Sequence, residues 1–480
     1  MSVPRWLRPF SAAVLVVLLV VSPPAQAQSG PPGRVDPALA DALDQALLGF
    51  AARYGVEGVS AAVVLPDGGV WVGADGYSTA EEPVEPDMAF GIGSATKTVT
   101  AALLLRLDEQ GLVDLDASVE TYLPWLSAYP NIPGSVTLRQ LLAHRSGIFN
   151  YTNNPDIQAV LWADPGHIVT PDELLSLVGP PLFAPGTRWS YSNTNFYLAG
   201  LVAETVKGAS VPEVYAASFF EPLGMTHTRF GWEPVPDGQR WAHGWGTLSD
   251  GTDIDLTTLS PNSNFSAAFS SGGLVSTAEE QARWAAALFG GDVVRPASLT
   301  EMTTLSTFTS SFPGGRAVGY GLGCFALELG GERVWAHSGR IAGYSGSMGY
   351  NPARRVGLAV LTNRSGSGNP DAMLAELHRV VVLNPVAAED TPETASGIEL
   401  HEVGPNPTTA NVTARFAVPS GSSARIEVLD ALGRKVRVLD LGGAREGEAE
   451  VNMSGLAPGV YAVRLVAGAE AAVRFVTVTR

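Results

Sequence analysis

A serine and a lysine three residues apart are the groups in this chain whose spacing most directly suggests chemistry. Residues 94–97 read Ser-Ala-Thr-Lys and open a segment that predicts a helix from Ser94 to about Gln110. Residues three apart lie on one face of a helix, so the Lys97 amine can reach the Ser94 hydroxyl. A serine becomes a good nucleophile only when a base takes its proton. The pair could therefore begin an acyl transfer.

The lysine can act as this base only if its amine is uncharged. Making a lysine neutral at pH 7 costs about 4.6 kcal/mol, because its ordinary pKa is near 10.4. Burial and the positive N-terminal end of a helix both favour the neutral amine. Residues 90–93 predict a strand that ends at this helix, which would expose the serine. The tetrad alone also fits a helix cap at Ser94 and a surface charge at Lys97.

Two later segments offer groups that would assist such a reaction. Residues 191–193 read Tyr-Ser-Asn; a tyrosine hydroxyl can pass a proton to a leaving group, and an asparagine amide can both donate to and accept from a substrate amide. Residues 337–339 read His-Ser-Gly and end a predicted strand before Arg340. A small residue there lets the backbone approach closely, and the next N–H can face an oxyanion. Taken singly, these segments also fit ordinary turn chemistry, a core tyrosine and a structural histidine.

The elements that must position these groups predict an α+β fold. Val59–Leu65 and Val70–Tyr77 predict strands around a Pro-Asp-Gly-Gly turn, and four strand-like runs return between residues 320 and 362. The middle of the chain is mostly helical and loop-like, and Asp371–Val382 predicts a closing helix. We therefore expect the first hairpin to join the late strands in one antiparallel sheet flanked by helices, with a helical subdomain beside it.

Composition divides the chain into four parts. A basic start, an apolar run and a small-residue cleavage site predict a removed signal peptide over residues 1–27. Residues 35–385 hold the α+β body, and residues 386–399 predict a linker without apolar periodicity. Six short strand candidates, separated by Gly and Pro turns, predict a small β-sandwich over residues 400–480.

Charge and missing motifs exclude several classes of function. The formal net charge of −17 argues against nucleic-acid partners and against adhesion to anionic lipid. Cys324 is the single cysteine, so no intrachain disulfide can form. The chain has no G-x-S-x-G elbow, no H-E-x-x-H and no P-loop, which argues against α/β-hydrolase, zinc and nucleotide chemistry. We expect no stable membrane span.

In their order and spacing, the three chemical segments resemble the serine β-lactamases of class C and the related D-alanyl-D-alanine carboxypeptidases and esterases. That family carries S-x-x-K, then Y-x-N, then a K/H-x-G triad. The resemblance covers roughly residues 35 to 385 and implies a β-lactamase and penicillin-binding-protein-like fold. Further matching segments are residues 137–148 (Thr-Leu-Arg-Gln-Leu-Leu-Ala-His-Arg-Ser-Gly-Ile), Phe183–Gly186, Glu221–Met225 and Ser271–Leu274.

The resemblance implies a catalytic role for three side chains. Ser94 would be the acylated nucleophile, and Lys97 and Tyr191 would share the general base and acid work. It leaves open which of Lys97 and Tyr191 takes the first proton. Water would be the usual final acceptor, and neither a metal nor a cofactor would be needed. His144, within residues 137–148, is expected to be structural.

The resemblance also implies a substrate-binding strand and an oxyanion hole. Asn193 would bind the substrate amide, and His337 and Gly339 would lie in the strand beside the substrate. The backbone N–H groups of Ser94 and Arg340 would bind the oxyanion. The loops over residues 151–165 and 247–264 would shape the acyl pocket, but they carry no readable specificity code.

One departure from the family bears on the substrate. Class C β-lactamases usually carry lysine where this chain has His337, whereas some carboxypeptidases carry histidine. Losing that fixed positive charge weakens the case for holding a carboxylate, although Arg340 could compensate. We therefore rank a D-alanyl-D-alanine carboxypeptidase-like enzyme or a broad amidase/esterase above a dedicated β-lactamase. The substrate would be a D-amino-acid peptide, an ester or a lactam. A non-catalytic cell-wall or peptide-binding protein on the same scaffold is the alternative from another class.

The end of the chain carries a second resemblance. Gly404–Pro407, Ile426–Arg434 and Leu456–Tyr461 resemble the C-terminal sorting domain of type IX secretion cargo. The resemblance implies that secretion machinery is a partner and that the protein is exported, either secreted or held at the cell surface. A generic β-sandwich binding module is the alternative interpretation.

Overall fold

The computed structural model describes residues 35–247, 250–259, 261–366, 368–384, 399–405, 408–418, 424–430, 434–442, 444, 446–467 and 470–479. The predicted signal peptide, and all of the predicted linker except its last residue, lie outside these ranges. Within them, no helix combines the length and apolar character that a bilayer crossing requires.

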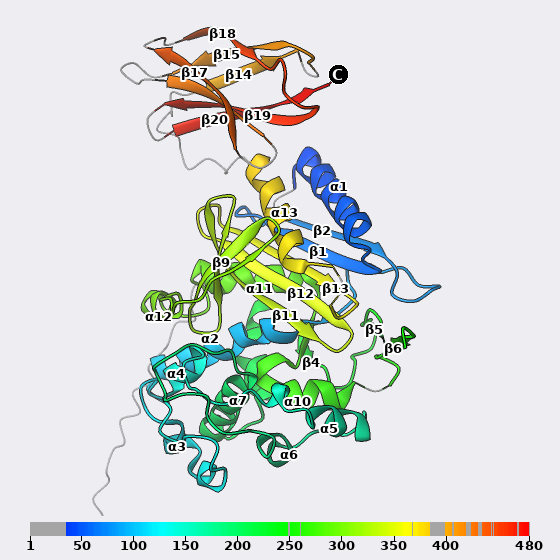
Figure 1. Ribbon diagram of the computed structural model, residues 1–480, viewed down its shortest axis with the longest axis vertical. Helices are drawn as coiled ribbons and strands as arrows, with labels where there is room; N and C mark the ends of the chain where they lie inside the picture. Colours follow the sequence, from blue (N-terminus) through cyan, green and yellow to red (C-terminus); the bar gives the residue numbers. More distant parts are fainter. Residues whose placement is uncertain are drawn as a thin grey trace, which may run out of the picture.

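An eight-stranded antiparallel sheet forms the centre of the main body, in the order β2-β1-β13-β12-β11-β10-β9-β8 (Figure 1). The first hairpin joins the late strands where Val59 of β1 pairs with Thr362 of β13. The predicted union of the two distant segments in one sheet is therefore confirmed. The strands are β1 (Gly58–Val64), β2 (Val70–Gly76), β8 (Ser310–Phe312), β9 (Gly315–Tyr320), β10 (Phe325–Leu329), β11 (Glu332–Ile341), β12 (Tyr344–Asn351) and β13 (Val356–Thr362).

Both faces of this sheet are covered by helices. Along β1, Val59 and Val63 belong to the core that the sheet shares with α1 (Pro37–Tyr54) and α13 (Pro370–Leu383). Ala62 belongs to the other core, which includes α11 (Ala278–Gly290). Alternate residues of a strand point to opposite faces, so a strand buried on both sides is apolar throughout.

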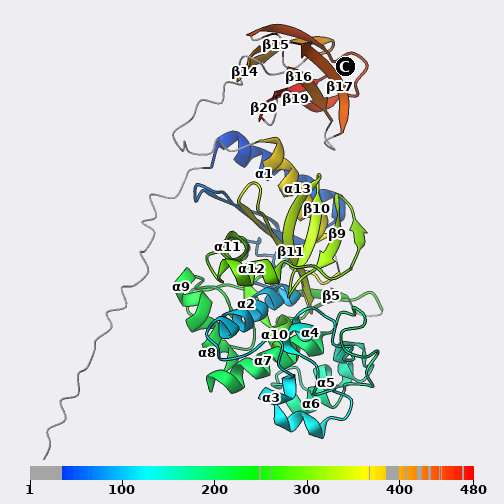
Figure 2. The same cartoon turned by 90° about the vertical axis from the view of Figure 1, so that its left-hand side faces the viewer.

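A helical region lies on the α11 side of the sheet (Figure 2). Helix α2 (Thr96–Glu109) runs through it and is buried from Thr96 to Leu105, as a core helix must be. The predicted helical subdomain is confirmed. The other helices of this region are α3 (Val119–Tyr122), α4 (Leu138–Leu142), α5 (Ile157–Ala163), α6 (Pro171–Leu175), α7 (Asn193–Lys207), α8 (Val211–Tyr215), α9 (Glu221–Leu223), α10 (Asn262–Gly272) and α12 (Pro296–Met302).

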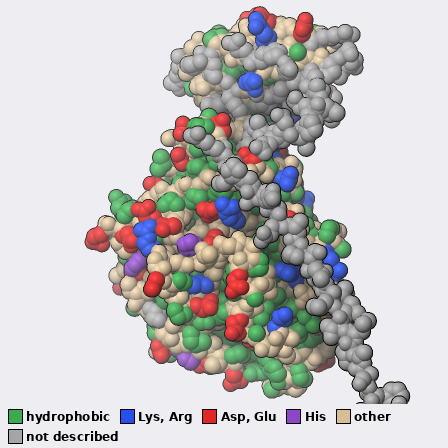
Figure 3. Space-filling view, turned by 180° about the vertical axis from the view of Figure 1, so that it is seen from behind, with side chains coloured by type: hydrophobic (Ala, Val, Ile, Leu, Met, Phe, Trp, Pro, Cys, Tyr) green, Lys and Arg blue, Asp and Glu red, His purple; other side chains and the backbone are tan. Residues whose placement is uncertain are grey.

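Short strands link the two parts of the body, and of these the sequence predicted only the one that leads into α2, over residues 90–93. A three-stranded sheet has the order β3-β7-β4 and holds the segment that leads into α2. On the rear of the molecule, acidic side chains lie among apolar and basic ones rather than in one patch (Figure 3). The short strands are β3 (Phe90–Gly91), β4 (Arg229–Phe230), β7 (Leu274–Ser276), β5 (Trp245–Thr247) and β6 (Asp253–Asp255).

The C-terminal part contains two antiparallel sheets around one apolar core, as the predicted β-sandwich requires. Val412 and Val451 from one sheet pack in the same core as Ile426 and Val463 from the other. The first strand was not predicted, because it begins at Glu399 within the expected linker. The sheets contain β14 (Glu399–Gly404), β15 (Asn411–Ala417) and β18 (Glu446–Asn452), and β17 (Lys435–Gly442), β16 (Ala424–Leu429), β19 (Gly459–Ala467) and β20 (Glu470–Val478).

Candidate active site

Ser94 lies in a short turn of 3-10 helix, Gly93–Ala95, between β3 and α2. Helix α2 itself begins at Thr96, two residues later than the sequence predicted. Gly93 has a φ of +50°, and a Cβ at this position would come within 2.5 Å of the Arg340 backbone nitrogen. The left-handed backbone and the close approach of β11 both require glycine here. The predicted strand-to-helix junction is therefore present and is packed against the strand that carries Arg340.

The Lys97 side chain is fully buried behind Ser94. Its Nζ lies 3.1 Å from Ser94 Oγ, 2.7 Å from Asn193 Oδ1 and 2.6 Å from the Ser271 carbonyl oxygen. The three partners come from the turn before α2, from the first residue of α7 and from the end of α10. Nζ also lies 4.9 Å from the centre of the Tyr191 ring. The amine is thus the point at which three distant parts of the chain meet.

Burial lowers the pKa of Lys97 well below its ordinary value, because the charged form loses its hydration. A neutral amine has two N–H groups and one lone pair. The carbonyl oxygens of Asn193 and Ser271 can only accept, so they take the two N–H groups. The lone pair is then left for the Ser94 hydroxyl, which is the orientation a base needs.

Tyr191 is half-buried in an aromatic group beside this amine. Its ring lies 4.2 Å from that of His144 and 6.4 Å from that of His337, measured between ring centres. Burial raises the pKa of the Tyr191 hydroxyl, and a hydrogen bond with Ser94 opposes part of that rise. The hydroxyl therefore keeps its proton at neutral pH and can donate it.

His337 is buried and uncharged. Its Nδ1 lies 2.6 Å from the Ser338 carbonyl oxygen, which can only accept, so Nδ1 carries the proton. Its Nε2 then accepts from the Tyr320 hydroxyl at 3.3 Å. Burial lowers the pKa of His337 to about 3. The side chain therefore supplies no positive charge at neutral pH.

The backbone of β11 at Gly339 passes against the turn that carries the serine. A Cβ at Gly339 would overlap the Ile92 carbonyl oxygen and would lie 2.9 Å from the Ser94 backbone nitrogen. Only glycine allows this approach, which brings the backbone of Arg340 beside that of Ser94. Two neighbouring backbone N–H groups of this kind suit an oxyanion.

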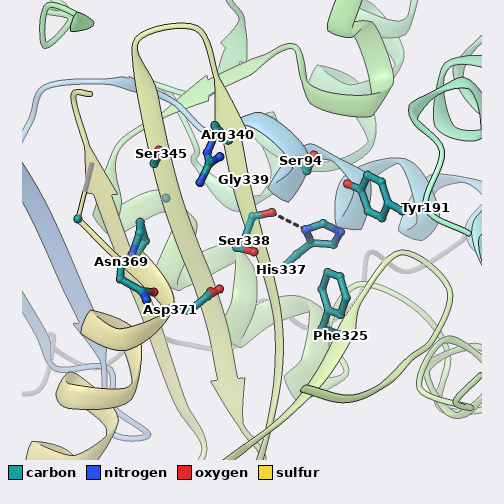
Figure 4. A pocket seen from close by; sticks show the side chains of 13 residues that line it. Ser94, Tyr191, Phe325, His337, Ser338, Gly339, Arg340, Ser345, Asn369 and Asp371 are labelled. Carbon is teal, nitrogen blue, oxygen red and sulfur yellow. Dashed lines mark hydrogen bonds between the residues drawn. The ribbon is translucent and has the colours of Figure 1, made fainter. Parts of the chain in front are cut away.

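Ser94 opens onto two hollows. The larger is a cleft of about 430 Å³, and the smaller is a recess of about 170 Å³. The cleft is lined by Ser94, Tyr191, Phe325, His337, Ser338, Gly339, Arg340, Ser345, Gly346, Gly368, Asn369, Pro370 and Asp371 (Figure 4). The recess is lined by Ser94, Tyr151, Thr152, Ile157, Leu161, Asn193, Asn264, Ala267, Ala268, Ser271, Gly272, Arg340, Ile341 and Ala342.

The seven residues predicted from the sequence come together at this place. Five of them line the cleft, Asn193 lines the recess and Lys97 lies behind the serine. The sequence did not point to the Ser271 carbonyl, since a backbone oxygen has no signature in the side chains. The sequence also did not predict that Asp371 lines the cleft, because this residue appeared only as the start of the predicted closing helix.

His144, expected to be structural, is buried behind Tyr191. Its Nδ1 accepts from the backbone N–H of Ser192 at 3.2 Å and lies 3.2 Å from the side-chain amide of Asn195. Both partners flank Asn193 at the start of α7. The ring thus packs against Tyr191 and braces the segment that carries two of the predicted site residues.

Two family matches cover most of the chain. Residues 43–383 match the Beta-lactamase family, and residues 402–479 match the secretion system C-terminal sorting domain. Because the first match spans more than half of the sequence, the chain belongs to the β-lactamase family. The sorting domain marks proteins exported through type IX secretion, so this is an exported member of that family.

Similar proteins include an amidohydrolase, an amidase and a D-alanine hydrolase. The structure of a D-stereospecific amidohydrolase from Streptomyces sp. is 32% identical, with a TM-score of 0.61, over 70% of this chain and 97% of that one. A D-amino acid amidase from Ochrobactrum anthropi SV3 is 25% identical, with a TM-score of 0.63, over 72% and 99%. The teichoic acid D-alanine hydrolase of Staphylococcus aureus is 28% identical over 39% of this chain and 43% of its own. The chain spans 40% to 58% of the length of the first curated relatives that it matches.

The contact between β11 and the serine turn gives a direct test of the site geometry. We expect Gly339→Ala to lower kcat/KM by about 100-fold, because a shift of about 1 Å in a catalytic group has that effect. Gly290→Ala at the end of α11 is the control, since its Cβ would meet no atom closer than 3.6 Å. Hydrolysis of a chromogenic ester measures both variants. Full activity in Gly339→Ala would contradict the assigned geometry.

Proposed function

We propose that this protein is an exported serine hydrolase that cleaves amide or ester bonds through an acyl-enzyme on Ser94. Its activity would be D-alanyl-D-alanine carboxypeptidase-like or that of a broad amidase/esterase. The observation that supports this most strongly is the buried Lys97 amine, 3.1 Å from the serine hydroxyl and with its pKa lowered by burial. A lysine held in this way has little structural value, since burying an amine costs several kcal/mol.

The first step would be attack of Ser94 Oγ on the substrate carbonyl while its proton moves to Lys97 Nζ. The lone pair left by the two carbonyl partners favours Lys97 over Tyr191 as this first base. The oxyanion would lie between the backbone N–H groups of Ser94 and Arg340. The proton would then pass from Lys97 through the Tyr191 hydroxyl to the departing nitrogen or oxygen, and water would hydrolyse the ester on Ser94.

The names of the relatives support amide and ester bonds as the target. The neutral state of His337 argues against a dedicated β-lactamase, because a fixed cation is missing at the position of the family's lysine. A non-catalytic binding protein is the rival from another class. The lowered pKa of Lys97 argues against it, since a receptor gains nothing from an uncharged buried lysine.

The acyl-enzyme can be tested with a fluorophosphonate probe, which modifies activated serines. We expect a single labelled tryptic peptide, the one containing Ser94, and no labelling and no ester turnover in Ser94→Ala. Ser60→Ala, a buried serine in β1, controls for the loss of a hydroxyl elsewhere. A label on any other serine, or turnover by Ser94→Ala, would contradict the proposal.

The role of Lys97 predicts a pH dependence. The neutral amine prevails above its lowered pKa, so activity is present above that pKa and is lost as pH falls through it. Lys97→Arg carries a permanent charge, and we expect its kcat/KM to fall by about 10³-fold. Acylation rates between about pH 5 and pH 10 measure both effects. An active Lys97→Arg enzyme would show that the amine is not the base.

A further inference from the structure

We propose that Asp371 makes the cleft beside Ser94 select substrates whose leaving group carries a positive charge, and reject those whose leaving group carries a carboxylate. The inference rests on the proposed acyl-enzyme function and names the substrate class for it. It favours an amidase or esterase for amino-bearing leaving groups over a carboxypeptidase, whose leaving group is an amino acid with a free carboxylate.

The two hollows can be assigned to the two halves of the substrate. Tyr191, the group proposed to protonate the leaving group, lines the cleft and is absent from the recess. Asn193, the group proposed to bind the acyl amide, lines the recess. The leaving group therefore occupies the cleft, and the acyl group occupies the recess. The described residues that line the recess include no acidic side chain, and Ile157, Leu161 and Ile341 make much of it apolar.

Asp371 lies in the first turn of α13 and faces the leaving-group side (Figure 4). The Ser347 hydroxyl donates to its Oδ1 at 2.7 Å. Burial raises the pKa of Asp371, and the nearby Ser347 and Ser338 hydroxyls oppose the rise. The carboxylate is thus held in a fixed position at the wall of the cleft.

The histidine at this end of the cleft offers no donor to a substrate carboxylate. The Nδ1 proton of His337 is directed to the Ser338 carbonyl. Asp371 therefore places a negative charge at this end of the cleft, which suits an ammonium group.

Arg340 does not cancel this charge. Among the described residues, no ion pair joins the Arg340 guanidinium to an acidic side chain, so it forms none with Asp371. Arg340 lines both hollows and is exposed, which places its charge at the boundary between the acyl and leaving-group sides. An exposed cation in water is screened more strongly than a carboxylate in the wall of a cleft.

The test uses three butanoyl esters that share the acyl group and differ in the charge of the alcohol. Choline provides a cation, 3,3-dimethylbutanol its neutral isostere and 3-hydroxypropanoate an anion. We expect Asp371→Asn to lower the choline to dimethylbutyl ratio of kcat/KM by about tenfold, the effect of one partly screened charge pair. The relative rate with the anionic ester should rise. The ratio is compared between enzymes because the alcohols differ in intrinsic reactivity.

Controls separate this inference from the proposed function. Glu81→Gln removes one exposed negative charge in the loop after β2 and should leave the ratio unchanged. In the unaltered enzyme, added salt should lower the same ratio, which tests the charge even if Asp371→Asn fails to fold. A ratio that is insensitive to salt, or to the Asp371→Asn exchange in a folded protein, overturns the inference alone. If the neutral ester shows no turnover that depends on Ser94, the proposed function is overturned, and this inference with it.

Discussion

The uncharged amine of Lys97, enclosed by protein, is the interaction on which the account depends. A charged ammonium in this position would cost several kcal/mol that its neutral partners cannot return, since carbonyl oxygens and a hydroxyl carry no full charge. Two of the three contacts to Nζ come from carbonyl groups, at 2.7 Å and 2.6 Å. They fix the direction of the lone pair as well as the position of the nitrogen. The burial of this one side chain thus determines the protonation state of the proposed base, and its two carbonyl partners determine the direction of its lone pair toward Ser94.

The fold brings the three partners of the Lys97 amine together from three different elements. The turn before α2 supplies the serine, the start of α7 supplies Asn193, and the end of α10 supplies the Ser271 carbonyl. Strand β11 completes the site because glycine at position 339 lets its backbone touch the serine turn. The eight-stranded sheet holds β11 in register, so the distances around Ser94 follow from the packing of the whole body rather than from any one loop.

The sequence predicted the parts of this arrangement that have a side-chain signature. The Ser94–Lys97 spacing, the Tyr191 and Asn193 segment and the glycine after His337 all identified the site, and the return of strands after residue 320 identified the sheet. It could not reveal what depends on tertiary contact. The Ser271 carbonyl, the tautomer of His337 and the place of Asp371 in the cleft have no local pattern. The strands β4 and β7, which were not predicted, are too short to show a period of two.

The most direct test of the central claim is the pKa of the Lys97 amine itself. The chain has only three lysines, Lys97, Lys207 and Lys435, so an NMR titration with lysine labelled at Cε and Nζ can be assigned from single variants. The account predicts that the resonance absent from Lys97→Met titrates well below the ordinary lysine pKa of about 10.4. A Lys97 resonance that titrates at that ordinary value would contradict it.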